Sequence, residues 1–336
     1  MNFNSPPYLS QEISVRRIMV QVLLALLPAI AAYTWLVGPV ILVQLGIASV
    51  VALAAEAVML RLRGKPLALF LGDGSVVVTA WLIVLAFPPL APWWLTLVGV
   101  LLAVVVAKHL YGGLGQNPFN PAMVAFAACI VSFPALMAQW PPVHPDAGFA
   151  DQLAIIFGQA QRLDAMSGAT PLDALKTALK LGADSSVANT RASAVFGQLG
   201  GHGWEWVAGA YLLGGLWLLQ RKVIGWHAPV AFLAGVALMA TPLWLWQPAQ
   251  YADPLFHIFS GGTLLGAFFI VTDPVSGCTT PRGKLIFGLA AGVLAYLIRV
   301  FGAYPDGVAF AILLLNLCAP LIDLYTQPPI FGHKKP

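Results

Sequence analysis

Long apolar runs, separated by short polar connections, follow one another along almost the whole chain. A helix that spans a bilayer needs about 20 predominantly apolar residues. Candidate spans lie at residues 16–37, 39–60, 75–91, 93–111, 121–138, 204–220, 226–246, 255–273, 285–301 and 305–325. The connections between them carry glycine, proline and charged residues, as turns do. The pattern therefore predicts an all-α polytopic membrane protein with about ten transmembrane helices.

A long polar segment divides these spans into two groups of five. Because an odd number of spans precedes it, the second group must enter the membrane from the opposite side. Corresponding landmarks recur in the two groups: Gly74-Ser75 and Gly262-Thr263 before short apolar runs, Pro88 and Pro274 after them, and HLYG at 109–112 and RVFG at 299–302. Inverted repeats with short helices at matching positions usually enclose a central site. We expect two inverted five-helix repeats, residues 1–138 and 204–336, joined by the loop 139–203, with the third and eighth spans lining the site.

The composition supports lipid rather than water as the surrounding solvent. Hydrophobic residues make up 59% of the chain and charged residues only 9%, whereas soluble domains are about 25% charged. The net charge of +4 is spread over the ends of apolar segments rather than gathered in one patch, so no nucleic-acid partner is expected. The N-terminus lacks the basic-then-apolar layout of a cleaved signal peptide, and the first span is expected to stay in the protein.

The distribution of basic residues predicts an orientation. With a cytoplasmic N-terminus, twelve of the 17 basic residues lie on the cytoplasmic side: Arg16, Arg17, Arg61, Arg63, Lys65, Lys108, Arg221, Lys222, Arg282, Lys284, Lys334 and Lys335. This is the bias of the positive-inside rule. The exceptions are Arg299, near a helix end, and four residues of the long loop, Arg162, Lys176, Lys180 and Arg191. We expect a multi-pass protein of the bacterial inner membrane, with both termini cytoplasmic and loop 139–203 periplasmic.

The loop contains the motif Asp164-Ala-Met-Ser167-Gly168-Ala169-Thr170. Thr170 supplies a hydroxyl, Gly168 lets a large group approach the backbone, and Ser167 offers hydrogen bonds. Thr170-Pro171-Leu-Asp173 also predicts a helix start, with threonine as the N-cap and proline in the first position. A phosphate on Thr170 would then lie among free N–H groups. The alternative is that Thr170 only caps a surface helix.

The motif resembles the DxxSGAT flavinylation signature of the RnfD and NqrB family. Further similarity covers essentially the whole chain, at Gly72-Asp-Gly-Ser75, at 112–121 (GGLGQNPFNP) and at Thr272-Asp-Pro-Val-Ser-Gly277. The short N-terminus is more similar to RnfD than to NqrB. This resemblance implies FMN joined through its phosphate to the Thr170 hydroxyl, with Asp164, Ser167 and Gly168 around the attachment.

The resemblance also implies a role as an electron-carrying subunit of an Rnf-type oxidoreductase, a translocase that couples electron transfer between NADH and ferredoxin to ion movement. The implied partners are a second subunit with covalent FMN, iron–sulfur subunits, an NADH-binding subunit and a periplasmic flavin transferase. No GxGxxG motif follows a strand in this chain, so NADH should bind elsewhere. The sequence does not decide whether Na⁺ or H⁺ is the coupling ion, or whether a second, noncovalent flavin such as riboflavin binds.

Five polar residues in or beside the spans are candidates for an ion path or a second flavin site: Glu56, Asp73, Asp273, Asn117 and Asn120. An isolated charge at the middle of a span costs about 2.5–3.5 kcal/mol. Glu56 must therefore face protein or water, and pairing with a buried basic residue is the alternative to ion passage. Helix caps and turns are the alternatives for the other four.

The three cysteines, Cys129, Cys278 and Cys318, are widely separated and form no CxxC pair, so no metal site is expected. A rival interpretation is a small-solute channel or transporter with the same inverted plan. It would explain the two Asn-Pro units, although both lie in the first half. It leaves the motif from Asp164 to Thr170 without a role.

Overall fold

A computed structural model describes residues 14–159, 168–181 and 186–328. These residues form helices and no β-strand, apart from two isolated bridges. Five helices are each long and apolar enough to cross a membrane: α1 (Val15–Leu36), α2 (Val40–Leu62), α12 (His227–Trp246), α15 (Pro281–Phe301) and α16 (Val308–Thr326). The all-helical fold is confirmed, and its helices have the length and composition of those in a polytopic membrane protein.

Shorter apolar helices overlap the other predicted spans. They are α4 (Ser75–Ala86), α5 (Trp93–Leu101) with its continuation η1 (Leu102–His109), α6 (Pro121–Ser132), α11 (Trp204–Gln220), α13 (Pro254–Phe259), and α14 (Thr263–Leu265) with its continuation η3 (Gly266–Ile270). Two short helices, α3 (Leu67–Leu71) and α7 (Pro134–Met137), belong to connections. Length alone does not make the shorter helices spans, so the count of ten and the inverted repeat stay predictions.

Proline and a capping side chain fix several helix starts. Asn120 accepts a hydrogen bond from the Met123 N–H at the start of α6. Asp253 and Thr280 cap α13 and α15 in the same way, and proline is the first residue of all three helices. Proline loses no hydrogen bond at this position, because the first N–H groups of a helix have no partner within it.

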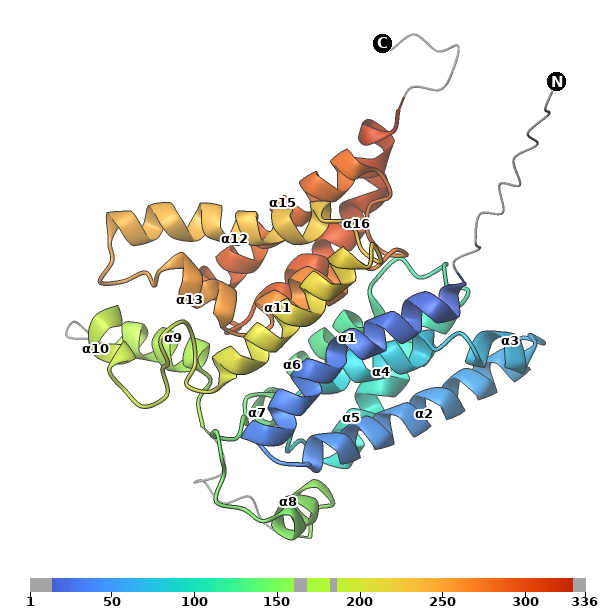
Figure 1. The fold of residues 1–336 in the computed structure, drawn as a ribbon, viewed down its shortest axis with the longest axis horizontal. Coiled ribbons are helices and arrows are strands. Elements are labelled where there is room, and N and C mark those ends of the chain that lie inside the picture. The colour runs from blue at the N-terminus through green and yellow to red at the C-terminus, as the bar shows by residue number, and fades with distance from the viewer. Residues whose placement is uncertain (1–13, 160–167, 182–185, 329–336) are drawn as a thin grey trace, which may run out of the picture.

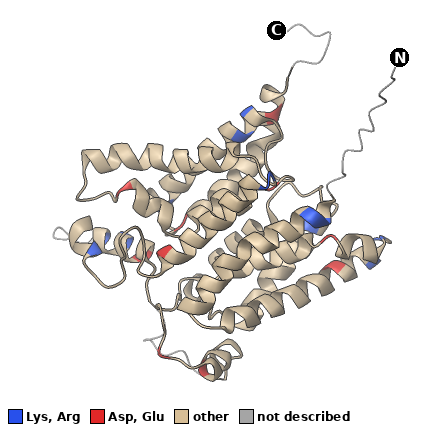
Figure 2. Ribbon diagram, in the orientation of Figure 1, with Lys and Arg blue, Asp and Glu red and all other residues tan. Residues whose placement is uncertain are grey.

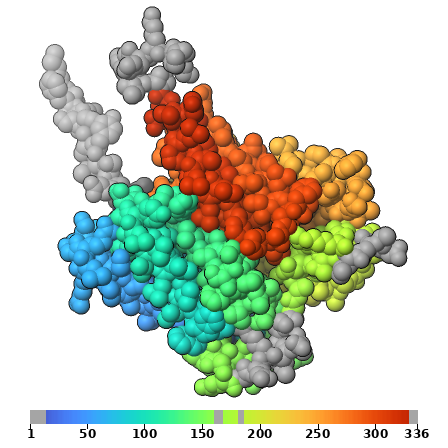
Figure 3. All heavy atoms as spheres, turned by 180° about the vertical axis from the view of Figure 1, so that it is seen from behind, coloured from blue at the N-terminus to red at the C-terminus, as the bar shows by residue number. Residues whose placement is uncertain are grey.

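The two groups of helices lie side by side, α1–α7 in blue to green and α11–α16 in yellow to red (Figures 1 and 3). Helix α1 packs along α11, and α15 packs against both α12 and α16. Gly214 allows the first of these contacts, since a Cβ there would lie 2.0 Å from the Ala25 carbonyl oxygen. Small residues let helix backbones approach closely in membranes. One hydrophobic core therefore runs through both groups.

The segment between the groups contains α8 (Phe149–Ile156), α9 (Pro171–Leu181) and α10 (Val187–Arg191). Helix α8 packs on the first group, where Ile155 and Ile156 share an apolar cluster with Val40 and Leu90. Helices α9 and α10 pack on the second group around Phe256, and Arg191 forms an ion pair with Asp253. The segment therefore crosses from one group to the other just before α9.

The start of α1 and the end of α16 lie at one end of the molecule, and α8–α10 lie at the opposite end (Figure 1). Charged residues gather at helix ends and in the connections, and leave long stretches of the helices uncharged (Figure 2). This arrangement agrees with termini on one side of a membrane and the long loop on the other. The identification of the termini's side as cytoplasmic stays a prediction from the charge bias.

Candidate functional site

Thr170 is the residue immediately before α9 and caps it. Its Oγ1 accepts a hydrogen bond from the Asp173 N–H at 3.1 Å and donates one to Asp173 Oδ2 at 2.8 Å. The helix start predicted from Thr170 and Pro171 is therefore confirmed. Asp164 and Ser167 of the motif lie outside the described residues.

Gly168 ties the motif to the first group of helices. Its N–H donates to the Trp140 carbonyl at 2.7 Å, within an antiparallel bridge. A Cβ on Gly168 would come no closer than 3.9 Å to this oxygen, so contacts within the described residues do not require glycine here. Its predicted role, to let a large group approach, stays a prediction.

Thr170 lines a cavity of about 380 Å³ between the two groups of helices. Most of the walls are apolar, and several are aromatic: Tyr33, Phe126, Trp140, Trp204, Tyr211, Phe259 and Tyr304. Trp204 forms edge-to-face contacts with Tyr33 and Trp140, with ring centroids 5.6 and 5.5 Å apart. The volume falls within the range of about 300–1,000 Å³ that small-molecule sites occupy.

The cavity also has a few polar groups. The Ser260 hydroxyl is buried and has no hydrogen-bond partner among the described residues. Thr170 and Asp173 lie on the wall beside α9, and Asp306 lies at the loop before α16. Aromatic walls with a few polar groups suit a flat ring system with a polar edge. The residues present therefore fit the flavin that the motif predicts.

Asp173 is the carboxylate closest to the Thr170 hydroxyl. Burial raises the pKa of Asp173 above its ordinary value, and the hydrogen bond from Thr170 opposes this shift. Lys176 lowers the pKa of Asp173, whereas Asp306 raises it. A carboxylate with a raised pKa is a stronger base, and this one already accepts the hydroxyl proton in a hydrogen bond.

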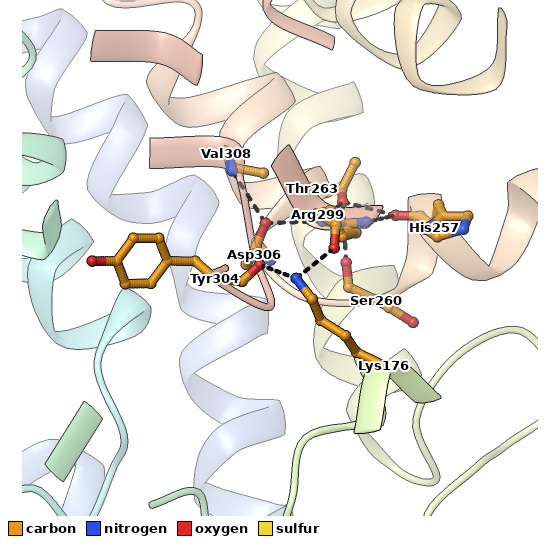
Figure 4. Close-up of polar contacts among 9 residues, drawn as sticks. Lys176, His257, Ser260, Thr263, Arg299, Tyr304, Asp306 and Val308 are labelled. Carbon is orange, nitrogen blue, oxygen red and sulfur yellow. Dashed lines mark hydrogen bonds and ion pairs between the residues drawn. The ribbon is translucent and has the colours of Figure 1, made fainter. Parts of the chain in front are cut away.

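Sequence reasoning missed a polar network beside this cavity (Figure 4). Arg299 of α15 donates to Asp306 Oδ1 at 3.0 Å, to Thr263 Oγ1 at 2.8 Å and to the His257 carbonyl at 2.7 Å. In the sequence, Arg299 stands out only as an exception to the positive-inside rule. The available signal was an arginine inside an apolar helix, which needs a partner there, with Asp306 as the next acid along the chain.

Lys176 joins the network from α9. Its Nζ donates to the carbonyls of Arg299, Gly302 and Tyr304 at 3.1, 2.6 and 2.9 Å (Figure 4). Burial lowers the pKa of Lys176, and Asp173 opposes this shift. The sequence places Lys176 in the loop but gives no sign of this contact.

Glu56 lies in a second buried cluster, away from Thr170. It is 2% exposed, and Lys108 Nζ lies 2.9 Å from its Oε1, while His109 Nε2 lies 2.9 Å from its Oε2. Lys108 also donates to the Ser75 hydroxyl at 3.3 Å, and Asp73 accepts from the Ser75 N–H at 2.7 Å. Glu56 is therefore the buried partner of a basic residue, which the sequence suggested as the alternative to ion passage.

The two buried clusters share three kinds of group: a basic side chain, a carboxylate and a hydroxyl at the start of a short helix. In one, Lys108 pairs with Glu56 and contacts Ser75 at the start of α4. In the other, Arg299 pairs with Asp306 and contacts Thr263 at the start of α14. The second cluster lies beside α9, and the first lies toward the opposite end of the bundle, near α3 (Figure 1).

Asp273 and Asn120 lie together in a third cluster. Asp273 Oδ2 accepts hydrogen bonds from Ser276 Oγ at 2.7 Å and from Asn120 Nδ2 at 3.3 Å. The Asn120 N–H donates to Asn316 Oδ1 at 3.1 Å. Asn117 is separate and donates to the Phe119 carbonyl at 3.0 Å. Neither these residues nor Glu56 and Asp73 line the cavity beside Thr170.

The described residues contain no group of three or more His, Cys, Asp or Glu side chains that could hold a metal ion. Cys129 and Cys278 are buried and Cys318 is exposed, and all three are free thiols.

Comparisons with known proteins match the chain over nearly its full length. The model of the NQR2, RnfD, RnfE family matches residues 2–332. A Pseudomonas aeruginosa protein, named as the D subunit of an ion-translocating oxidoreductase complex, is 54% identical over 319 residues, 95% of this chain and 92% of that protein. Proteins of the same name from Escherichia fergusonii and Alcanivorax borkumensis are each 50% identical over 98% of this chain, and over 98% and 96% of their own lengths.

Proposed function

Since this chain belongs to the NQR2, RnfD, RnfE family, we propose that it is the flavin-carrying RnfD component of an Rnf-type complex in the bacterial inner membrane. The names of its relatives support a place in an ion-translocating oxidoreductase complex. In this proposal Thr170 carries FMN through a phosphoester. The complex couples electron transfer between NADH and ferredoxin to ion translocation.

The observation that carries the proposal is the position of Thr170. Its hydroxyl caps the N-terminus of α9, and the residue lines the aromatic cavity between the two groups of helices. A phosphate here would lie at the positive end of the helix dipole. The ring system attached to it would reach a largely apolar space.

Attachment needs the Thr170 oxygen to bond to the flavin phosphorus of a flavin dinucleotide, while the phosphoanhydride bond breaks, a nucleoside monophosphate leaves and the hydroxyl proton departs. Asp173 accepts a hydrogen bond from this hydroxyl, so its carboxylate is placed to take the proton. A threonine hydroxyl is a weak nucleophile without such help, and we propose that a periplasmic flavin transferase also acts on it. Once bound, the flavin would accept and donate electrons.

Electrons would reach this flavin from partner subunits. We assign NADH binding, the iron–sulfur clusters and a second covalent FMN to those subunits, as the family resemblance implies. Coupling requires the redox state of the flavin to change the relative stability of two conformations. The cavity borders both groups of helices, so a flavin there would contact both of the parts that could move.

The test is fluorescence of the chain after denaturing electrophoresis, because a covalent flavin stays with the band. Thr170→Val removes the hydroxyl but keeps a similar shape, so we expect complete loss of fluorescence with normal membrane levels and no electron transfer through the complex. Thr170→Ser, which keeps a hydroxyl, and Thr190→Val, in the same segment, should stay fluorescent. Cells without the transferase should give a dark band.

Two results would contradict this proposal. A fluorescent Thr170→Val band would place the flavin on another residue. A dark wild-type band, from cells that make the transferase, would favour the channel or transporter interpretation instead.

A further inference from the structure

Helix α9 carries Thr170 at its start and Lys176 in its second turn. The two residues are six positions apart, a rise of about 9 Å along a helix. Lys176 uses all three of its N–H donors on the end of α15 and the loop that follows it. Any shift of α9 relative to this loop would therefore move the attachment point of the flavin.

The acceptors for Lys176 suit a positive charge. Arg299 and Gly302 lie at the C-terminal end of α15, where carbonyls have no partner within the helix and carry partial negative charge. Lys176 is only partly exposed, and its ammonium is the group on α9 that reaches these carbonyls. Lys180, one turn later, is exposed and makes no hydrogen bond or ion pair with another described residue.

The loop that holds Lys176 is itself bonded to the start of α14. Asp306 Oδ2 accepts a hydrogen bond from the Gly262 N–H at 2.6 Å, and its Oδ1 accepts one from Arg299. Arg299 in turn reaches Thr263, the first residue of α14. Gly261, next to this start, has φ +63°, and a Cβ there would lie 2.5 Å from Asp306. Close packing leaves this junction little room to move.

We propose that Lys176 is a positioning residue, which seats the flavin-bearing helix α9 on the loop that also holds the start of α14. This inference rests on the proposed attachment of FMN at Thr170. The ammonium of Lys176 fixes the flavin's place in the cavity and ties it to the second group of helices. Without the ammonium, FMN could still be attached to Thr170, but its ring system would move more freely in the cavity and would have different neighbours.

The experiment uses the full chain, flavinylated in cells that also make the transferase. Lys176→Met removes the ammonium and keeps an unbranched apolar side chain, and Lys180→Met is the matched control on the same helix. Three properties are measured for each variant: covalent fluorescence after denaturation, fluorescence anisotropy of the folded chain, and the midpoint potential of the flavin. Lys176→Met should keep the covalent flavin, lower the anisotropy and shift the potential, whereas Lys180→Met should match the wild type in all three.

Lys176→Arg is the conservative variant. It keeps the charge, but a planar guanidinium does not direct three bonds from one nitrogen, so its anisotropy and potential should lie between those of the wild type and Lys176→Met. If Lys176→Met does not reach the membrane, the arginine variant decides the question. Wild-type anisotropy and potential in the deciding variant would overturn the inference. A dark wild-type chain would instead overturn the attachment at Thr170.

Discussion

In the part of the chain that the structure describes, each buried acidic, lysine or arginine side chain lies in an ion pair. Glu56 pairs with Lys108, and Arg299 pairs with Asp306. An unpaired charge at the middle of a membrane helix costs about 2.5–3.5 kcal/mol, so Glu56, inside α2, needs a partner most. Pairing also explains why Arg299 departs from the charge bias. Its charge is neutralised inside the protein and does not act at a membrane surface.

Glu56 can be tested separately from the flavin. Glu56→Gln should keep the covalent flavin, because Glu56 does not line the cavity beside Thr170, but should weaken ion transport or electron flow. Removing one partner of a buried pair can cost about 3–5 kcal/mol, so the membrane level of the variant is measured with its transport. The double variant Glu56→Gln, Lys108→Met is the control, because it removes both charges.

The double variant separates two roles for Glu56. If it transports normally, Glu56 only neutralises Lys108. If it reaches the membrane at normal levels but does not transport, the pair of Glu56 and Lys108 takes part in coupling. Unchanged transport in the single variant would make Glu56 a purely structural residue.

Among the elements, the closest helix contacts depend on glycine. A Cβ on Gly292 of α15 would lie 2.1 Å from the Phe232 carbonyl oxygen of α12, and a Cβ on Gly235 would lie 2.3 Å from the Leu289 oxygen. These are backbone atoms, which cannot move aside as a flexible side chain can. The two helices therefore pack with their backbones in contact, as small residues permit in membranes.

Gly292→Ala should accordingly destabilise the protein, by about 1–3 kcal/mol if the helices adjust as in other overpacked cores. Gly209→Ala, in α11, is the matched control, because its Cβ would meet nothing within 4 Å. Alanine favours helix over glycine by up to about 1 kcal/mol, so the control should be neutral or stabilising. Thermal unfolding in detergent measures the stability of both variants. Equal unfolding midpoints for the two would show that α12 and α15 separate easily.

The orientation of the whole molecule can be measured by thiol labelling. In a background with Cys318 replaced by alanine, a cysteine at the exposed Ala150 of α8 should react with an impermeant thiol reagent from the periplasmic side. A cysteine at Lys335 should not, because the charge bias places the C-terminus in the cytoplasm. The buried Cys129 and Cys278 should stay unlabelled. Labelling with the opposite sidedness would move the proposed flavin to the cytoplasm.

Local patterns determined much of the fold and part of the site. The apolar runs predicted where helices form, because burial in lipid and backbone hydrogen bonding both depend on contiguous residues. Thr170 and Pro171 predicted the start of α9, because capping acts between residues three apart. The cost of charge in lipid required Glu56 to have a partner or water, without saying which.

Only the tertiary structure decided which distant residues meet. Lys176 contacts carbonyls more than 120 positions later, and the cavity has walls from both groups of helices and from the loop between them. Such contacts depend on how helices pack, and side-chain shape at each interface sets that packing rather than any periodic pattern. The motif could therefore point to Thr170 as a candidate, but only the folded chain shows the cavity that Thr170 lines and the lysine that bonds its helix to the end of α15.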